Sequence, residues 1–411
     1  MNRLRTIVII LTAATLLFAS CHPKQKLFDP VAVDFKADYN PVFDGLLYPS
    51  MILALSGTSA STTAQNLFTV EVTSPRDNAV LRVVIDSSNL NYVTIFQEVM
   101  PRRGERYTFS PAVKWKYDNL YRMRQQGVAD LTFTCFINDE EVDVKNLRLN
   151  YRSVNECPLT LVSRGETYDF RWLFSAYVNE EHPYIDQILT EILDQGTISR
   201  FVGYQSGEKA VCDQVFAIWH YALSRGITYS SISCTPNPSR KANVQHIRFF
   251  DEVYNTKQAN CVDACVFFAS IMRKIGLKPV IFVEPCHAYL GYYTDKNRKH
   301  VELLETTITS WVNYPDMERN LDADGRLPQN QLDKISKYLT DKQLQQYEAG
   351  KMTFDELKLA LSHQLFDRAS TYNAETYTAN LSLFADSTQA QYQQLDLELL
   401  RKQVQPISSP R

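Results

Sequence analysis

The sequence of 411 residues has no long basic run, and its charges nearly balance, with 43 Lys and Arg against 46 Asp and Glu. Proteins that bind nucleic acid carry a concentrated positive surface, so the sequence predicts no nucleic-acid partner. Beyond its first residues the chain lacks a charge-free apolar run of the roughly 20 residues that a bilayer-spanning helix needs. It has no internal repeat either. These absences exclude a transmembrane protein and a repeat protein.

The composition is that of an ordinary globular protein. Hydrophobic residues make up 45% of the chain and charged residues 22%, and 23 Tyr and 21 Phe can fill cores. Such a composition excludes wholesale disorder. At roughly 150 residues per domain, the length predicts two or three domains.

The first residues predict an export signal. Arg3 and Arg5 precede an apolar stretch from Ile7 to Phe18, and small residues lead to Cys21. The segment Leu17-Phe18-Ala19-Ser20-Cys21 resembles a bacterial lipobox, which implies that residues 1–21 comprise a signal peptide and a lipidated Cys21. The alternative is a plain secretory signal with an incidental Cys. In both cases we expect an exported protein, and the lipobox predicts one anchored to a membrane on its periplasmic or surface face.

Residues 28–152 predict a β-sandwich-like domain. Segments rich in β-branched and aromatic residues alternate with turn clusters that contain Pro, Gly, Asn and Asp. The predicted strands are 67–72, 81–85, 92–96 and 131–137. We expect this domain to pack or bind, because it shows no catalytic spacing.

Residues 153–312 change to a helical period. Apolar residues recur at helical spacing and stop at Gly196, Gly226 and Gly276, which predicts three helices with glycine ends. Strand-like segments follow at 279–283, 287–294 and 300–305. A helix that leads into an antiparallel sheet is an α+β arrangement.

Residues 313–411 predict a helical C-terminal region that packs on the domain before it. Thr340 and Thr353 begin capping boxes, and the residues after Thr353 form an apolar helix face.

One stretch of the central region offers the three groups that a cysteine enzyme needs: a thiolate, a histidine that moves protons and a polar group that orients the histidine. Asn260 and Asp263 predict a capped helix start with Cys261 in its first turn, where unpaired N–H groups and the helix dipole stabilise a thiolate. His287 begins a predicted strand, and Glu305 lies on the next one. The order predicts a triad of Cys261, His287 and Glu305.

The same residues lie in three blocks: Asn260-Cys261-Val262-Asp263, Cys286-His287-Ala288 and Leu304-Glu305-Thr306-Thr307. In this order the blocks resemble those of the transglutaminase-like (papain-related) cysteine enzymes, more narrowly a bacterial subgroup of exported lipoproteins, and the resemblance extends over residues 155–310. It implies a transglutaminase-like domain in which Cys261 is the nucleophile, His287 is base and acid, and Glu305 orients His287.

Two residues depart from the family pattern. Cys286 stands where the family usually has Gly, which crowds the strand edge or places a second thiol near the nucleophile. Glu305 replaces the commoner Asp and lengthens the reach by one methylene. Neither change removes the mechanism.

Two further residues are candidates for contact with the substrate. The backbone N–H of Cys261 can stabilise an oxyanion, and the side-chain amide of Gln245 or Gln258 can add to it. We prefer Gln245, because it lies in an upstream block that also resembles the subgroup. Tyr289 shares a strand face with His287, so it either lines a cleft or packs within the sheet.

Two alternatives compete with the triad. Cys261, Cys265, Cys286 and His287 offer a Cys₃His metal set, but residues 286 and 287 point to opposite faces of a strand, so we predict no metal site. The other alternative is a catalytically inactive transglutaminase-like binding or scaffold module of the cell envelope, in which Cys261 is inert or bonded to Cys265 or Cys286. Without Cys21 the number of cysteines is odd, which favours a free thiol in an oxidising compartment.

The sequence therefore predicts an exported cysteine protease, amidase or transglutaminase-like acyltransferase that acts on peptide or isopeptide bonds through a thioester. The expected partners are a peptide or protein substrate, with a cell-wall peptide among the options, and a membrane that holds the lipid on Cys21. Hydrolysis is favoured over cross-linking, because nothing marks a site for an acceptor amine. No cofactor is expected, since thiol and imidazole suffice for the reaction.

Overall fold

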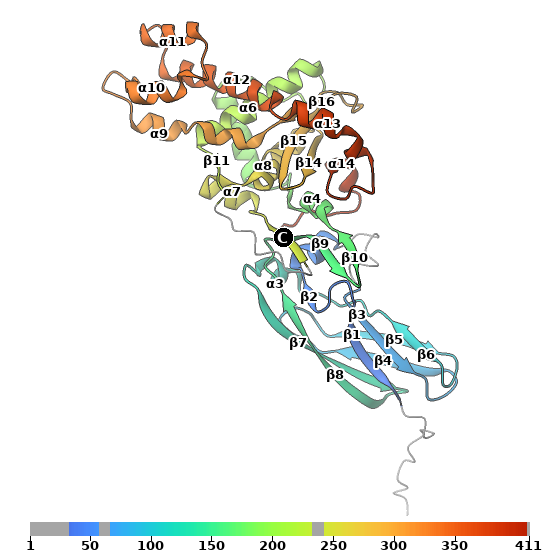
Figure 1. Cartoon of the computed structure of the whole chain (residues 1–411). Helices are drawn as coiled ribbons and strands as arrows, with labels where there is room; N and C mark the ends of the chain where they lie inside the picture. The colour runs from blue at the N-terminus through green and yellow to red at the C-terminus, as the bar shows by residue number, and fades with distance from the viewer. Residues whose placement is uncertain (1–32, 57–65, 232–241, 409–411) are drawn as a thin grey trace, which may run out of the picture.

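The computed structural model describes residues 33–56, 66–231 and 242–408. The predicted signal peptide and Cys21 lie outside these residues. The described chain is α+β and elongated, with β1–β8 towards one end and helices α9–α12 at the other (Figure 1). No helix within the described ranges is long and apolar enough to cross a membrane.

Two sheets form the N-terminal part, with strand orders β1-β3-β6 and β2-β8-β7-β4-β5. Their apolar residues point inward in alternation, and Phe68 of β3 meets Phe133 of β7 between the sheets, with ring centroids 5.3 Å apart. The elements are β1 (Phe35–Tyr39), β2 (Leu46–Leu47), α1 (Pro49–Ala54), β3 (Phe68–Thr73), β4 (Ala79–Ile85), β5 (Thr94–Met100), β6 (Arg106–Phe109), α3 (Tyr117–Arg122), β7 (Gly127–Ile137) and β8 (Glu140–Tyr151).

The predicted strands at 67–72, 81–85 and 131–137 correspond to β3, β4 and β7 and are confirmed. The prediction at 92–96 begins two residues before β5. The long strand β8 was not predicted, because its side chains are mostly polar or half-buried and give a weak alternation.

A short sheet of order β10-β9-β12 follows the N-terminal sheets along the molecule (Figure 1). It consists of β9 (Glu156–Ser163), β10 (Glu166–Asp169) and β12 (Ala242–His246). The 3-10 helix η1 (Arg171–Leu173) and α4 (Phe174–Tyr177) lead from it to the helical part.

Three central helices lie where the apolar period predicts them. They are α5 (Tyr184–Asp194), α6 (Gly207–Arg225) and α8 (Cys261–Lys274). Gly226 follows α6 with a φ of +71°, a left-handed conformation that glycine adopts without steric cost. The short α7 (Phe250–Thr256) lies between α6 and α8, and β11 (Thr228–Tyr229) pairs in parallel with β13 (Gln258–Ala259).

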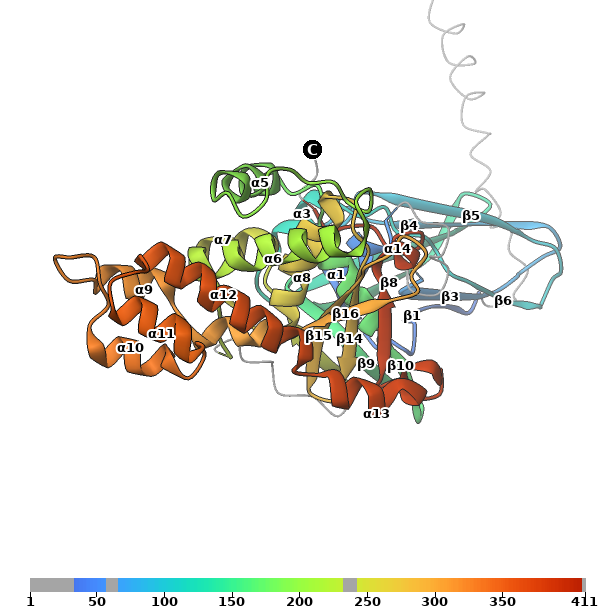
Figure 2. The ribbon, with the colours of Figure 1, turned by 90° about the horizontal axis from the view of Figure 1, so that it is seen from above.

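The central sheet has the order β16-β15-β14-β17. Its strands are β14 (Pro279–Glu284), β15 (His287–Tyr293), β16 (Val301–Leu304) and β17 (Gln393–Asp396). Figure 2 shows α8 on one side of β14 and β15 and α13 (Ala374–Ala385) on the other. On the α13 side, Phe282 and Tyr289 form a small core with Tyr377 and Phe384 of that helix.

The C-terminal region contains the predicted helices and one strand that was not predicted. After η2 (Thr306–Trp311), the helices are α9 (Tyr314–Arg319), α10 (Gln329–Ser336), α11 (Asp341–Glu348), α12 (Phe354–Thr371), α13 and α14 (Leu397–Leu400). The capping boxes at Thr340 and Thr353 are confirmed. Strand β17 pairs with β14, so the region after residue 312 contributes to the central sheet as well as covering it.

Candidate active site

The N-terminus of α8 is held rigidly by its own residues. The Asn260 side chain accepts a hydrogen bond of 2.9 Å from the N–H of Asp263, and the Asp263 carboxylate accepts one of 3.0 Å from the N–H of Asn260. This reciprocal capping box confirms the predicted helix start and makes Cys261 the first residue of the helix. The half-buried Cys261 thiol therefore lies among the first-turn N–H groups of α8.

Asp263 also anchors the helix start to the chain after β12. Its carboxylate accepts hydrogen bonds from the backbone N–H of Arg248 at 2.8 Å and from the Arg248 guanidinium at 2.9 Å. The side chain is completely buried. Burial raises the pKa of Asp263, because its desolvation outweighs the hydrogen bonds from Asn260 and Arg248. The ion pair between Arg248 and Asp263 therefore fixes the position of the N-terminus of α8 more than it stabilises the fold.

His287 contacts Cys261 and Glu305 at the same time. Its Nε2 lies 2.8 Å from Oε2 of Glu305, and its ring also interacts with the Cys261 side chain. Since Nε2 faces the carboxylate, Nδ1 is the nitrogen left for the thiol. The interactions with Cys261 and with Glu305, of which that with Cys261 has the larger effect, raise the pKa of His287 to about 10. At neutral pH the imidazole is therefore protonated and can share its proton with the sulfur.

Glu305 is the residue directly after β16, where it begins η2, and its side chain is 0% exposed. Oε1 accepts bonds from the N–H of Thr307 at 2.9 Å and from its hydroxyl at 2.6 Å. Oε2 accepts bonds from His287 and from the Asn373 amide. Burial acts to raise the pKa of Glu305, but the donors, above all His287, hold it below the ordinary range. The carboxylate is thus charged and fixed in orientation.

The turn before His287 bears on one departure from the pattern of the family that the sequence resembles. Pro285 and Cys286 join β14 to β15 in a two-residue turn, in which Glu284 pairs with His287. Cys286 has a φ of +66° and is exposed. Glycine adopts this left-handed conformation without strain, whereas a residue with Cβ does not. The Gly that is usual in the family suits the turn better than Cys286.

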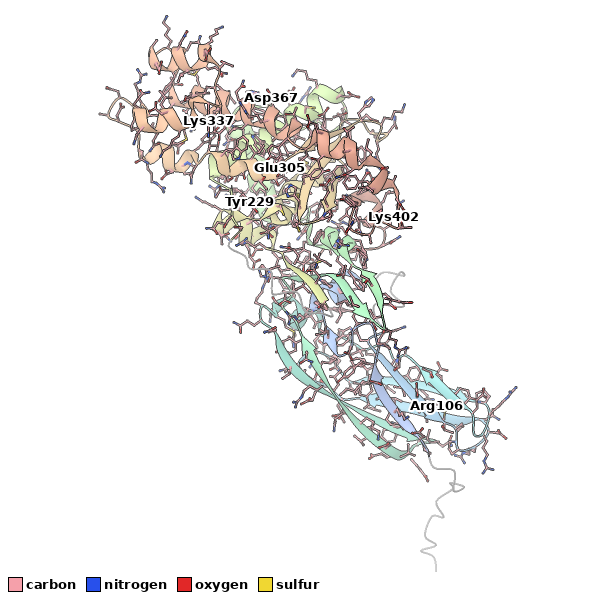
Figure 3. The ribbon with its side chains drawn as sticks, in the orientation of Figure 1. Arg106, Tyr229, Glu305, Lys337, Asp367 and Lys402 are labelled. Atoms are coloured by element: carbon pink, nitrogen blue, oxygen red, sulfur yellow. The ribbon has the colours of Figure 1, made fainter. Side chains whose placement is uncertain are left out.

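Tyr229 on β11 is a site residue that the sequence reasoning did not single out. Burial raises the pKa of the Tyr229 phenol, and the negative charges of Cys261 and Glu305 raise it further, so the hydroxyl lies near both groups. The side chain is 36% exposed, and Figure 3 shows Tyr229 and Glu305 in the same part of the molecule. Strand β11 pairs with β13, which ends two residues before Cys261, and this pairing brings Tyr229 to the start of α8.

Gln245 lies close to the N-terminus of α8, but its amide is already engaged. Its Nε2 donates to the carbonyl of His246 at 2.9 Å, and the Asn260 amide donates to the same carbonyl at 3.3 Å. The structure thus brings Gln245 near the helix start, where one N–H of its amide is bonded to this carbonyl and the second is the donor left for an oxyanion. Gln258, the less favoured candidate, is half-buried in β13.

Tyr289 is not available to a substrate, so its interpretation as a cleft residue is corrected. Its ring centroid is 6.0 Å from that of His287, as the shared strand face predicts. The side chain is nevertheless 0% exposed, because it stacks on Phe282 beneath α13 and donates a hydrogen bond of 3.1 Å to Glu284. The covering helix comes from a distant part of the sequence.

The structure does not assemble the Cys₃His set. Cys265 is buried 4.0 Å from the Thr306 hydroxyl, where burial raises the pKa of its thiol well above the ordinary value, and Cys286 is exposed in the turn. Within the described ranges, the group that could hold a metal is Glu208, Asp295 and His300. It is at the surface and does not involve the triad. All six cysteines in the described part of the chain are free.

No family model and no curated protein matches this sequence. The site must therefore be interpreted from its geometry. A thiol at a helix N-terminus, an imidazole bonded to it and a buried carboxylate behind the imidazole form a nucleophile, a proton carrier and an orienting group. This set of groups can carry out acyl transfer.

Proposed function

We propose that the protein is an exported transglutaminase-like cysteine enzyme that cleaves peptide or isopeptide bonds through a thioester. Its architecture would be an N-terminal β-sandwich, a central transglutaminase-like domain and a C-terminal helical region. The observation that carries the proposal is the arrangement of His287 between Cys261 and Glu305: the imidazole is hydrogen-bonded to the buried carboxylate and interacts with the thiol at the start of α8. Burying a charged carboxylate costs desolvation free energy, and buried charges with several specific partners are typical of functional sites.

The reaction follows from the positions of the groups. The Cys261 thiolate attacks the carbonyl carbon of the substrate amide, and the N–H groups of the first turn of α8 stabilise the oxyanion. Protonated His287 gives its Nδ1 proton to the departing amine, and a thioester remains on Cys261. Water then gives a proton to His287 as its oxygen attacks the thioester, which releases the acid and restores the Cys261 thiolate beside protonated His287. Glu305 stays ionised throughout and orients the ring.

The first test is the alkylation of Cys261 by iodoacetamide across pH, read by peptide mass spectrometry. We expect fast labelling that persists well below pH 8 and slows in His287→Ala. Cys286 is a free, exposed thiol in the same chain and provides an internal reference for an ordinary rate. If Cys261 labels no faster than Cys286, the site is not an activated pair, and the inactive scaffold module becomes the better interpretation.

The second test is the direct detection of the thioester on Cys261. The full chain is mixed with peptide amides and quenched in acid, and Cys261 peptides are searched for a stable acyl adduct that Cys261→Ala lacks. Addition of a fluorescent primary amine then separates two reactions, because transfer labels the acyl product whereas hydrolysis does not. We expect hydrolysis to dominate.

We also propose that the chain is anchored to a membrane through lipid on Cys21. The support is the lipobox-like segment Leu17-Phe18-Ala19-Ser20-Cys21. Cys21→Ser should move the protein from the membrane fraction to the soluble fraction after expression in a bacterium that processes lipoproteins. Equal fractionation of both forms would contradict the anchor.

A further inference from the structure

The C-terminal region reaches the candidate active site through Asn373, which lies between α12 and α13 and is 7% exposed. Its Nδ2 donates a hydrogen bond of 2.6 Å to Oε2 of Glu305. In addition, the backbone N–H of Glu305 donates a bond of 2.9 Å to the carbonyl of Ala369, in the last turn of α12. The C-terminal region therefore holds both the backbone and the side chain of Glu305.

Asn373 and His287 bind the same carboxylate oxygen. Oε2 of Glu305 accepts both bonds, while Oε1 accepts two bonds from Thr307. A carboxylate has about four lone-pair sites, so this one is fully occupied. The Asn373 bond leaves one lone pair of Oε2 to the imidazole and stops the carboxylate from rotating. It therefore fixes the direction in which the His287 ring points.

Asn373 does not cap helix α13, although capping is the usual role of an Asn at the start of a helix. Asn373 occupies the N-cap position of α13, where an Asn side chain usually accepts a bond from an N–H two or three residues later. Within the described part of the chain its side chain makes no capping bond, and its φ of −96° and ψ of 5° are not the extended values of a typical N-cap. The amide is turned to Glu305 instead.

We propose that Asn373 is a positioning residue of the active site, which acts through Glu305 to keep His287 directed at Cys261. The inference rests on the proposed function and extends it, because it makes the C-terminal region a part of the catalytic unit. The expected effect is that of a hydrogen bond to a charged group, about a tenfold to hundredfold change in rate when it is lost.

In the described part of the chain, few titratable groups surround the Glu305 carboxylate, so a change in its ionisation can be traced to a small set of residues. The titratable groups that interact electrostatically with Glu305 come from α8, β11 and β15, and they are Cys265, Tyr229, His287 and Tyr289. His287 is the basic member of this set, and it is already bonded to Glu305. A new carboxyl at position 373 would therefore couple directly to Glu305.

The test compares two variants of Asn373 with a matched control. Asn373→Leu removes the donor. Asn373→Asp keeps the shape, and because two adjacent carboxyls share one proton, its O–H can replace the amide as donor to Glu305. The control is Asn380→Leu on α13, since Asn380 also donates to a carboxylate, that of Glu284 at 3.1 Å, without touching the triad.

Two readouts are taken on the full chain: the rate of Cys261 alkylation at pH 6 and the titration of His287 by NMR with ¹⁵N-labelled histidine. We expect Asn373→Leu to label Cys261 about tenfold to a hundredfold more slowly and to lower the pKa of His287. Asn373→Asp should label Cys261 at the wild-type rate at pH 6. In a second measurement at pH 7.5 it should label more slowly than wild type at the same pH, because the shared proton has left. Asn380→Leu should change neither readout.

A role in packing alone predicts a different pattern. Both Asn373 variants would then change thermal stability, as Asn380→Leu does, with wild-type labelling and an unchanged His287 titration, and the proposal would be overturned. If Asn373→Leu does not fold, the near-isosteric Asn373→Asp decides, through its labelling rate relative to wild type at pH 6 and at pH 7.5. If wild-type Cys261 labels as slowly as His287→Ala, the proposed function fails, while the His287 titration still shows whether Asn373 governs the bond between Glu305 and His287.

Discussion

Replacement of Glu305 by Gln is the most informative single change, because it alters the charge of the buried residue and keeps its size. The carboxylate accepts two bonds from Thr307 on one oxygen and bonds from His287 and Asn373 on the other. The N–H of Thr307 can only donate, so the single oxygen of Gln must stay on Thr307. The new NH₂ group then faces Nε2 of His287.

This arrangement reverses the hydrogen bond on the imidazole. In the neutral ring Nε2 becomes the acceptor and the proton lies on Nδ1, where the ring can no longer take a proton from Cys261. The imidazolium also loses a charged partner. A hydrogen bond to a charged group contributes about 1.5 to 3 kcal/mol, equivalent to roughly one to two pKa units. The pKa of His287 should therefore fall from about 10 by that amount.

The expected result for Glu305→Gln is at least a hundredfold slower acyl-enzyme formation, since serine proteases lose about 10⁴-fold in kcat when the orienting acid becomes an amide. Acyl-enzyme formation and the His287 titration are measured on the same preparation. Glu302→Gln is the control, because Glu302 is exposed on β16, the strand that ends directly before Glu305. Glu305→Gln with wild-type acylation and a His287 pKa still near 10 would refute the reasoning.

Three further predictions concern stability. Arg248→Met should cost about 3 kcal/mol in urea unfolding, because it leaves the completely buried Asp263 charge without its cation, and the double variant with Asp263→Ala should cost less than the sum of the two single changes. Cys286→Gly should raise the thermal midpoint, since it removes a left-handed Cβ conformation that costs roughly 1 to 2 kcal/mol, and an unchanged or lower midpoint would contradict the strain. Burial lowers the pKa of His220 to about 4, so acid protonates this group only in the unfolded chain, and the unfolding free energy should fall by up to about 3 kcal/mol between pH 6.5 and pH 4. In His220→Gln the unfolding free energy should no longer fall in this way between pH 6.5 and pH 4. If it falls equally in both proteins, groups other than His220 cause the pH dependence.

The sequence was sufficient for the elements that have local signals. Helix α8 begins where Asn260 and Asp263 predict it, because a capping box needs only four consecutive residues. Helix α6 ends at Gly226 for an equally local reason. His287 and Glu305 come together because β15 and β16 are consecutive strands that pair, which is the commonest arrangement.

The rest depended on contacts between distant residues, which leave no local pattern. Strand β17 is a polar segment, Gln393–Asp396, and its pairing with β14 is decided by the sheet edge that it covers. The burial of Tyr289 depends on Tyr377 and Phe384 of α13, and that helix has no buried residue to mark its inner face. Asn373 is one polar residue among many in its segment until Glu305 is placed beside it.

Glu305 is longer than the Asp of the resembling family, and its additional side-chain freedom is restricted in part by the C-terminal region. Glu has one more rotatable bond than the Asp that is usual in the resembling family, so fixing its carboxylate costs more conformational entropy. In this chain the additional freedom is removed from both sides, by Thr307 on one oxygen and by Asn373 on the other. A shorter Asp at position 305 would not reach His287 from the same backbone position, and it would leave both partners without their acceptor. The acid and its supports therefore form one unit, and a chain that carries Glu at this position needs the segment that supplies Asn373.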